Sequence, residues 1–265
     1  MAAQSLTESY TGTVVDWYVP NHTAGTLRVT CHGADGARAA GTPNGRGGYG
    51  GSVRGYLNVT PGTLLKLVVG ADGFELSPPS FMAKGGFPYG MTDKRGGCAT
   101  EVWDASSTRI MVAGGGGTGA AKGSRGYDGG LGIADGETQG TYSFGGTLTA
   151  HGAAGANAGG GGTAATAGSS AGGGYGTGGD GGSYVYVGRG GGGGGGYYNG
   201  GGGGSTLGTG YGGGGGSSWC DTGLFSSVDD DGATNGAQFI YIEWDGDPVW
   251  IPPSGGIYVD GAVHF

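Results

Sequence analysis

The chain has 265 residues, of which 75 are Gly and 9 are Pro, and its formal net charge at pH 7 is −8. Leu, Ile, Val and Phe number 40 in all, about 15 per cent, which is below the level at which a conventional apolar core is assured. With 12 basic and 20 acidic residues, the chain lacks the positive charge that dominates nucleic-acid affinity. Composition leaves two readings, a disordered chain and a fold built largely from backbone.

The first 112 residues contain short apolar runs bounded by Gly, Pro or Asn, as β-strands usually are. In "TLRVTCHG" the apolar residues Leu27, Val29 and Cys31 alternate with polar ones, which is the period of a half-buried strand. The runs 57–59 and 64–69 flank the turn signal "TPG". This arrangement predicts an antiparallel hairpin.

Three further runs predict strands, and they lie on both sides of a glycine-rich middle. The runs "TVVDWYVP" and "TRIMVAGGGG" precede the middle, and "AQFIYIEW", residues 237–244, follows it. No window has the periodicity of an amphipathic helix. We therefore expect a small β-sandwich that the glycine-rich segment divides in sequence.

The middle, residues 113–218, holds 49 of the 75 glycines. Collagen is excluded, because collagen needs Gly at every third position and abundant Pro. A flexible linker is compatible with the composition but would leave the eight tyrosines of this segment in water. The third reading is a bundle of polyglycine type II helices, whose outward N–H and C=O groups bond to neighbouring helices.

Energetics favour a bundle that is closed at both ends. Ordering one residue costs about 1–2 kcal/mol, whereas one backbone hydrogen bond contributes a net of about 0.5–1.5 kcal/mol. An isolated glycine helix should therefore melt. Several helices packed together, held between strands with an apolar core and covered by tyrosines at their turns, can be stable.

The predicted fold is thus all-β: a small antiparallel β-sandwich with an inserted bundle of polyglycine type II helices and almost no α-helix. We divide the chain into an N-terminal part of the sandwich (1–112), the glycine-rich bundle (113–218), a closing strand segment (219–246) and an extended C-terminal tail (247–265).

Four stretches in a fixed order resemble a known family. They are "DWYVPNHTAGTLRVTCHGADG", "VTPGTLLKLVVGADG", "IMVAGGGG" and "GGGGGSS" followed later by "NGAQFIYIEW". This series is similar to the glycine-rich domain of bacteriophage minor tail proteins and tail-fibre adhesins, and to the glycine-rich extracellular region of anaplastic lymphoma kinase. The resemblance covers residues 10–244 and implies a β-sandwich with inserted polyglycine helices. The family carries no catalytic residues, so none is transferred to this chain.

The resemblance implies a non-enzymatic minor tail protein, at the tail tip or in a fibre, that displays loops for host recognition. Its expected partners are other tail proteins and a host-envelope glycan or glycolipid, with neither nucleic acid nor membrane insertion, and a homotrimer is left open. The first twelve residues lack the basic and apolar regions of a signal peptide, which fits synthesis in the host cytoplasm and assembly into the virion. The alternatives are a structural spacer or assembly adaptor and, less favoured, an RGG-type RNA-binding protein.

Aromatic residues are the candidates for binding. Tyrosines on turns either cover the ends of glycine helices or form a face for sugars, and the pair Tyr197 and Tyr198, between two glycine runs, is expected at a tip. The apolar tail is a candidate for docking to a neighbouring protein. The receptor-binding candidates are Tyr175, Tyr197, Tyr198 and Tyr211, and the docking candidates are Trp250, Ile251, Tyr258 and Phe265.

Motifs for other chemistry are weak. "GSSAG" at 168–172 lacks the strand and helix of a nucleophile elbow, and "DDDG" at 229–232 lacks the ligand spacing of a calcium loop and reads as a solvated turn. The four histidines, at 22, 32, 151 and 264, are scattered without ligand spacing, and one or two of them are expected to be ordinary hydrogen-bonded surface groups. The three cysteines fit free thiols. We assign no metal and no cofactor. RGG triplets begin at Arg46, Arg95 and Arg189 and carry the RNA-binding alternative.

Overall fold

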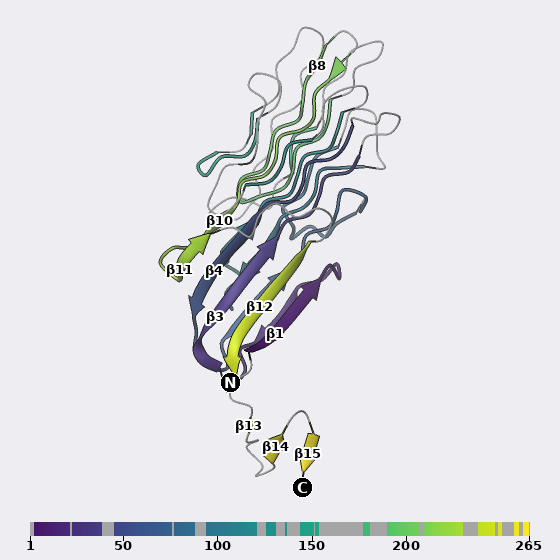
Figure 1. The fold of residues 1–265 in the computed structure, drawn as a ribbon. Coiled ribbons are helices and arrows are strands. Elements are labelled where there is room, and N and C mark those ends of the chain that lie inside the picture. The colour runs from purple at the N-terminus through teal and green to yellow at the C-terminus, as the bar shows by residue number, and fades with distance from the viewer. Residues whose placement is uncertain are drawn as a thin grey trace.

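A computed structural model gives two antiparallel β-sheets with a bundle of glycine-rich segments extending from one end of them (Figure 1). No helix occurs among the residues that the structure describes. These residues are 3–21, 23–38, 45–75, 77–87, 94–120, 126–130, 136, 144–150, 152–153, 177–180, 190–206, 209–229, 238–246, 249–250, 257–259 and 262–264.

The first sheet, sheet A, has the strand order β1-β12-β3-β4-β11, and all its pairs are antiparallel. The closing strand β12 inserts between β1 and β3, and thereby joins residues from the two ends of the sandwich sequence. The prediction of a sandwich divided by the glycine-rich segment is confirmed. The strands are β1 (Ala3–Ser9), β3 (Thr23–His32), β4 (Ser52–Asn58), β11 (Phe225–Asp229) and β12 (Phe239–Gly246).

The second sheet, sheet B, has the order β10-β7-β6-β5-β2 and is also antiparallel. Its strands β6 and β7 are buried along their whole length. The strands are β2 (Val15–Tyr18), β5 (Leu64–Val68), β6 (Thr100–Trp103), β7 (Arg109–Ala113) and β10 (Trp219–Cys220).

The main core lies between the two sheets. The predicted alternation holds only in part. Leu27, Val29 and Cys31 are fully buried and Arg28 is partly exposed, but Thr30 and His32 are buried as well, so the end of β3 next to the bundle is covered on both faces. Sheet B contributes the opposite half of the core. The core includes Leu27, Val29, Ile240 and Ile242 from sheet A, and Leu65, Leu67, Val102, Ile110 and Met111 from sheet B.

The predicted hairpin across "TPG" is wrong. Residues 57–58 belong to β4 in sheet A, whereas 64–68 form β5 in sheet B, so the turn passes from one sheet to the other. The turn is hydrogen-bonded to the segment that follows β2, where the Gly62 amide donates to the Val19 carbonyl at 2.8 Å. β4 and β5 each turn an apolar face to the same core. Because the two strands belong to sheets that pack face to face, both apolar faces are buried between the sheets.

The bundle is centred on residues 114–119, which are surrounded by other segments of the chain. Their amides donate to three of these segments, and their carbonyls accept from three others, so the central segment bonds to six neighbours. Part of the bundle comes from residues before 113. The six neighbours are residues 33–38, 45–51, 94–99, 126–130, 190–196 and 211–217.

The hydrogen bonds repeat every three residues. Gly115 and Thr118 donate their amides to the carbonyls of Gly195 and Gly192, so residues three apart on one segment meet the same neighbour. Three residues per turn without internal bonds is the repeat of the polyproline II conformation. The predicted polyglycine type II bundle is therefore confirmed for the described segments.

Glycine is required here for space. A Cβ placed on Gly117 would lie inside van der Waals contact with the Gly213 carbonyl, and one on Gly116 would overlap the Gly48 carbonyl. Successive residues of a three-fold helix face different neighbours, so no position of the central segment points into open space. The close approach of backbones takes the place of side-chain packing.

Two small sheets complete the fold. Strands β8 (Ser205–Thr206) and β9 (Thr209–Gly210) pair at the end of the bundle far from the sandwich (Figure 1). Strands β13 (Val249–Trp250), β14 (Ile257–Val259) and β15 (Ala262–His264) form an antiparallel meander. The tail, expected to be simply extended, thus contains paired strands.

Candidate binding surfaces

The turn at Tyr197 and Tyr198 lies against sheet B. The Tyr197 ring stacks on Trp219 with the ring centroids 4.5 Å apart, and Tyr198 meets Tyr197 edge-on at 5.2 Å. Tyr197 also packs against a small buried cluster of Ala83, Ala99 and Val112. The turn between glycine segments is present as expected, but its expected place at a tip is wrong. Stacking on Trp219 places it at the junction between bundle and sandwich.

A buried ion pair fastens this junction. The Arg109 guanidinium donates to both Glu101 carboxylate oxygens, at 2.7 and 2.9 Å. The Trp103 indole N–H donates to the same carboxylate at 2.6 Å. Arg109 also donates to the Gly196 carbonyl at 3.0 Å, one residue before the tyrosine turn. One guanidinium therefore links strand β7, strand β6 and a glycine helix.

The pKa of the Tyr197 phenol reflects its position at the junction between bundle and sandwich. Burial raises the pKa of its phenol, and the neighbouring Tyr198 adds to the increase. The Arg109 guanidinium lies 5.6 Å from the Tyr197 ring centroid and acts in the opposite direction on the pKa. A phenol that is half-buried between Trp219 and Arg109 is poorly placed to bind a sugar.

Tyr211 lies at the other end of the bundle. It directly follows β9, and its amide donates to the Gly204 carbonyl at 3.0 Å. Its side chain is partly exposed. Among the three tyrosine candidates that the structure describes, Tyr211 is thus the one far from the sandwich. Tyr175 lies outside the described residues.

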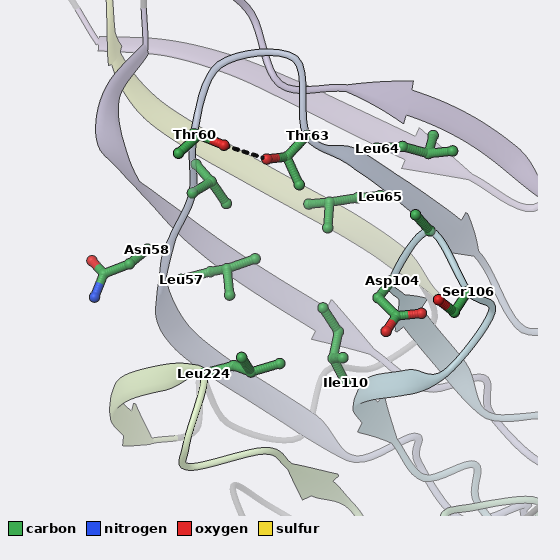
Figure 2. Close-up of a pocket in the computed structure, with 12 residues that line it drawn as sticks. Leu57, Asn58, Thr60, Thr63, Leu64, Leu65, Asp104, Ser106, Ile110 and Leu224 are labelled. Atoms are coloured by element: carbon green, nitrogen blue, oxygen red, sulfur yellow. Dashed lines mark hydrogen bonds between the residues drawn. The ribbon is translucent and has the colours of Figure 1, made fainter.

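An apolar groove opens between the sheets, lined by side chains from both of them (Figure 2). It lies at the end of the sandwich opposite the bundle, because Leu57 and Ile110 stand at the ends of β4 and β7 that are far from the glycine segments. We call this cavity of about 530 Å³ the end groove. Leu57, Leu65 and Ile110 point into it, and Leu224, with 45% of its surface exposed, flanks its mouth. Its lining residues are Leu57, Asn58, Val59, Thr60, Thr63, Leu64, Leu65, Asp104, Ala105, Ser106, Ile110 and Leu224.

Two turns hold the rim of the end groove in place. The hydroxyls of Thr60 and Thr63 are hydrogen-bonded at 3.1 Å across the first turn (Figure 2). In the second turn the Asp104 carboxylate accepts from the Thr108 amide at 2.8 Å. Ser107 in this turn has φ 64°, a left-handed conformation that is uncommon for a residue with a side chain. The groove is therefore a defined feature of the sandwich, which the sequence did not predict.

Two of the docking candidates are register partners. Trp250 of β13 pairs with Tyr258 of β14 in the meander. Ile251 and Phe265 lie outside the described residues. Both paired aromatics therefore belong to one small sheet at the C-terminal end of the chain.

No cluster of three or more His, Cys, Asp or Glu side chains suited to a metal ion occurs among the described residues. Asp229 ends strand β11, where Arg54 donates to its carboxylate at 2.9 and 3.0 Å, so this first residue of "DDDG" is not part of a solvated turn. Of the four histidines, His32 is fully buried and lies against the Phe239 ring, so it is not one of those expected at the surface. "GSSAG" lies outside the described residues.

The three cysteines are free, as the sequence predicted, and all three are buried. Burial raises the pKa of each thiol, and for Cys220 burial and the neighbouring Asp221 raise the pKa to about 12. Such thiols are poor nucleophiles, because the thiolate is the reactive form. The cysteines therefore act as small apolar core residues.

The RGG arginines are engaged within the protein where they are described. Arg95 is buried and donates to the Gly85 carbonyl at 2.6 Å, and Arg46 lies over the Tyr49 ring at 4.1 Å. Arg189 lies outside the described residues. These contacts give no support to an RNA-binding role.

Comparison with protein-family models finds no family that matches this chain. Comparison with curated proteins likewise finds no match. Within the described residues, no helix has the length and apolar character needed to cross a membrane. Functional inference therefore depends on the geometry of the chain itself.

Proposed function

We propose that this protein is a non-catalytic display protein: the sandwich end holds it to its neighbours, and the glycine bundle presents binding loops at the opposite end. The observation that carries the proposal is that the molecule has two different ends. Ala3 of β1 pairs with Asp245 of β12, so both ends of the sandwich chain lie at one pole. The bundle extends from the other pole (Figure 1).

The bundle suits such a role physically. Residues 114–119 and 190–196 each bond to several neighbouring segments, and this network resists bending better than a single extended chain would. Loops carried by a rigid scaffold are the usual location of binding residues. Tyr211 is the described aromatic candidate at this end.

The sequence resemblance supplies the biological setting. We propose a minor tail protein of a bacteriophage, located at the tail tip or in a fibre, made in the host cytoplasm and carried on the virion. Its partners are other tail proteins at the sandwich pole and a host-envelope glycan or glycolipid at the bundle pole. Neither nucleic acid nor membrane insertion is needed for this role.

The test uses the purified full-length chain. Fluorescently labelled protein is expected to bind host cells and to reduce the adsorption rate of the phage that encodes it, and antibodies against it are expected to label intact virions. Binding to cells that resist the phage serves as the control. Absence of the protein from virions would refute the tail assignment, and its presence without competition would refute the recognition role.

A second role is favoured by one observation, the junction position of Tyr197 and Tyr198. Because these tyrosines stack within the molecule, fewer aromatics remain for recognition, and the bundle could act as a rigid spacer or assembly adaptor. In that case the protein is present on virions and a tailless chain, 1–246, fails to be incorporated. Purified protein then leaves adsorption unchanged.

A further inference from the structure

We infer that the end groove binds the C-terminal segment, residues 247–265, of a second copy of this chain. The inference concerns how copies of the protein associate, and it does not depend on the proposed role in host recognition. It starts from two apolar features that lie at the same pole. One is the groove itself, and the other is the tail that leaves the sandwich there.

The groove offers an apolar floor and a mixed apolar and polar rim. Its floor is formed by Leu57, Leu65 and Ile110, and the described lining residues all belong to the two sheets and their turns. Leu224 stands at the mouth with 45% of its surface exposed. The floor residues are each no more than 4% exposed, so the apolar surface open to a partner comes from Leu224 and from the partly exposed Val59 and Leu64 at the rim. Apolar surface bordered by polar residues is a feature of protein-binding sites.

The tail, residues 247–265, is apolar enough to bind in such a groove. Residues 247–265 include Val249, Trp250, Ile257, Tyr258 and Phe265 among their apolar side chains. The strands of the meander have 2, 3 and 3 residues. Strands this short need an apolar surface to pack on, because a small isolated sheet is at best marginally stable in water.

The tail leaves the sandwich beside the groove. Gly246, the last residue of β12, pairs with Thr23 of β3. Two residues further along β3, the Gly25 carbonyl accepts from the amide of Val59, which lines the groove, at 2.8 Å. Each copy therefore offers a groove and a tail at one pole.

Symmetry favours a second copy as the source of the tail. The pairings of the meander strands are internal, and the meander lies apart from the two sheets (Figure 1). Two copies that meet at this pole bury both grooves and both tails by exchange, which is the self-complementary arrangement of a two-fold dimer. The bundles then point outward and remain accessible.

Light scattering coupled to size-exclusion chromatography tests the inference with four chains. The full-length protein is expected at twice its 25.6 kDa, whereas the truncated chain 1–246 and the full-length variant Leu224→Arg are expected as monomers. Phe74→Arg is the control, since Phe74 is exposed to 58%, similar to Leu224, and does not line the groove. This variant should remain a dimer. Circular dichroism checks that each chain is folded.

Mixing gives the decisive result. The truncated chain keeps its groove and the Leu224→Arg chain keeps its tail, so an equimolar mixture should form a complex that neither chain forms alone. A mixture that stays monomeric would overturn the inference. So would a full-length protein that is monomeric at 50–100 µM, roughly the range where weak dimers form, or a truncated chain that is still a dimer. Binding to host cells is scored separately, so a failed cell assay does not affect this result.

Discussion

The guanidinium of Arg109 and the carboxylate of Glu101 form a two-point ion pair whose side chains are 3% and 0% exposed. Besides Trp103, the pair contacts the tyrosine turn of the bundle, where Arg109 donates to the backbone carbonyls of Gly196 and Tyr197. The pair thus sits where the sandwich meets the bundle. Its geometry makes it a structural connection between them.

Removing one partner of this pair should be strongly destabilising. Arg109→Met leaves the Glu101 carboxylate buried without its counter-ion, which typically lowers the free energy of unfolding by about 3–5 kcal/mol. Urea unfolding followed by circular dichroism measures the loss. The double variant Arg109→Met, Glu101→Leu removes both charges and should recover much of it. Equal losses in the single and double variants would contradict this account.

Alanine is expected to disrupt the centre of the bundle. In Gly117→Ala the new methyl group meets the Gly213 carbonyl well inside contact distance, so backbone must move. Overpacking of this kind lowers the free energy of unfolding by about 1–3 kcal/mol. Thermal and urea unfolding provide the measurement.

Gly223→Ala is the matched control for this variant. A Cβ on Gly223 would have as its nearest neighbour the Asp221 side chain, at 3.1 Å, on an exposed turn. The change should therefore be within about 0.5 kcal/mol of wild type, as for most surface substitutions. If the two variants lose the same free energy of unfolding, the close backbone contact between Gly117 and Gly213 does not require glycine.

Much of the fold was predictable because strand period and glycine runs are local signals. The alternation at Leu27, Val29 and Cys31 predicted β3, and the "IMVA" run predicted β7. The three-residue repeat of the bundle followed from what glycine backbone can do without side chains. These features need no knowledge of distant contacts.

The rest depended on which segments meet, and that is a long-range property. The turn at 60–62 has the same sequence signal whether its strands share a sheet or face each other across a core. Tyr197 lies between glycine runs, but its place at the junction follows from Trp219 and Arg109. The one local signal that was missed is a charge inside each of two apolar strands, Glu101 and Arg109.

The buried thiols should resist modification in the native protein. Cys31, Cys98 and Cys220 are each no more than 1% exposed, and burial holds their thiol pKa values high. Ellman's reagent at pH 8 is therefore expected to react with none of the three until guanidinium chloride unfolds the chain, and then with all three. Fast reaction of any thiol in native protein would contradict their placement.

The same thiols predict a loss of stability in alkali. The pKa of Cys220 is about 12 when folded and near 9 in the unfolded chain, so only the unfolded state ionises between these values. The stabilising contribution is fully present below pH 9 and is lost as pH rises from 9 towards 12. The urea midpoint should decrease as the pH is raised from about 8 to about 10.5, and the decrease should be smaller for Cys220→Ala than for wild type.

The two ends of the bundle should respond differently to loss of a tyrosine. Tyr197→Leu removes the stacking on Trp219, the edge contact with Tyr198 and part of the cover over Arg109, so it should lower the free energy of unfolding by about 1–3 kcal/mol. Tyr211→Leu changes a partly exposed ring far from the sandwich and should change the free energy of unfolding by less than about 1 kcal/mol.

Under the proposed function the order of the two variants reverses for binding to host cells. Tyr211→Leu is expected to bind more weakly than Tyr197→Leu, when both are measured below the unfolding temperature of Tyr197→Leu. Unfolding curves and cell-binding titrations on the same two preparations separate the effects. If Tyr197→Leu keeps full stability but loses binding, the tyrosine turn is a recognition surface after all, and the structural assignment of the junction is wrong.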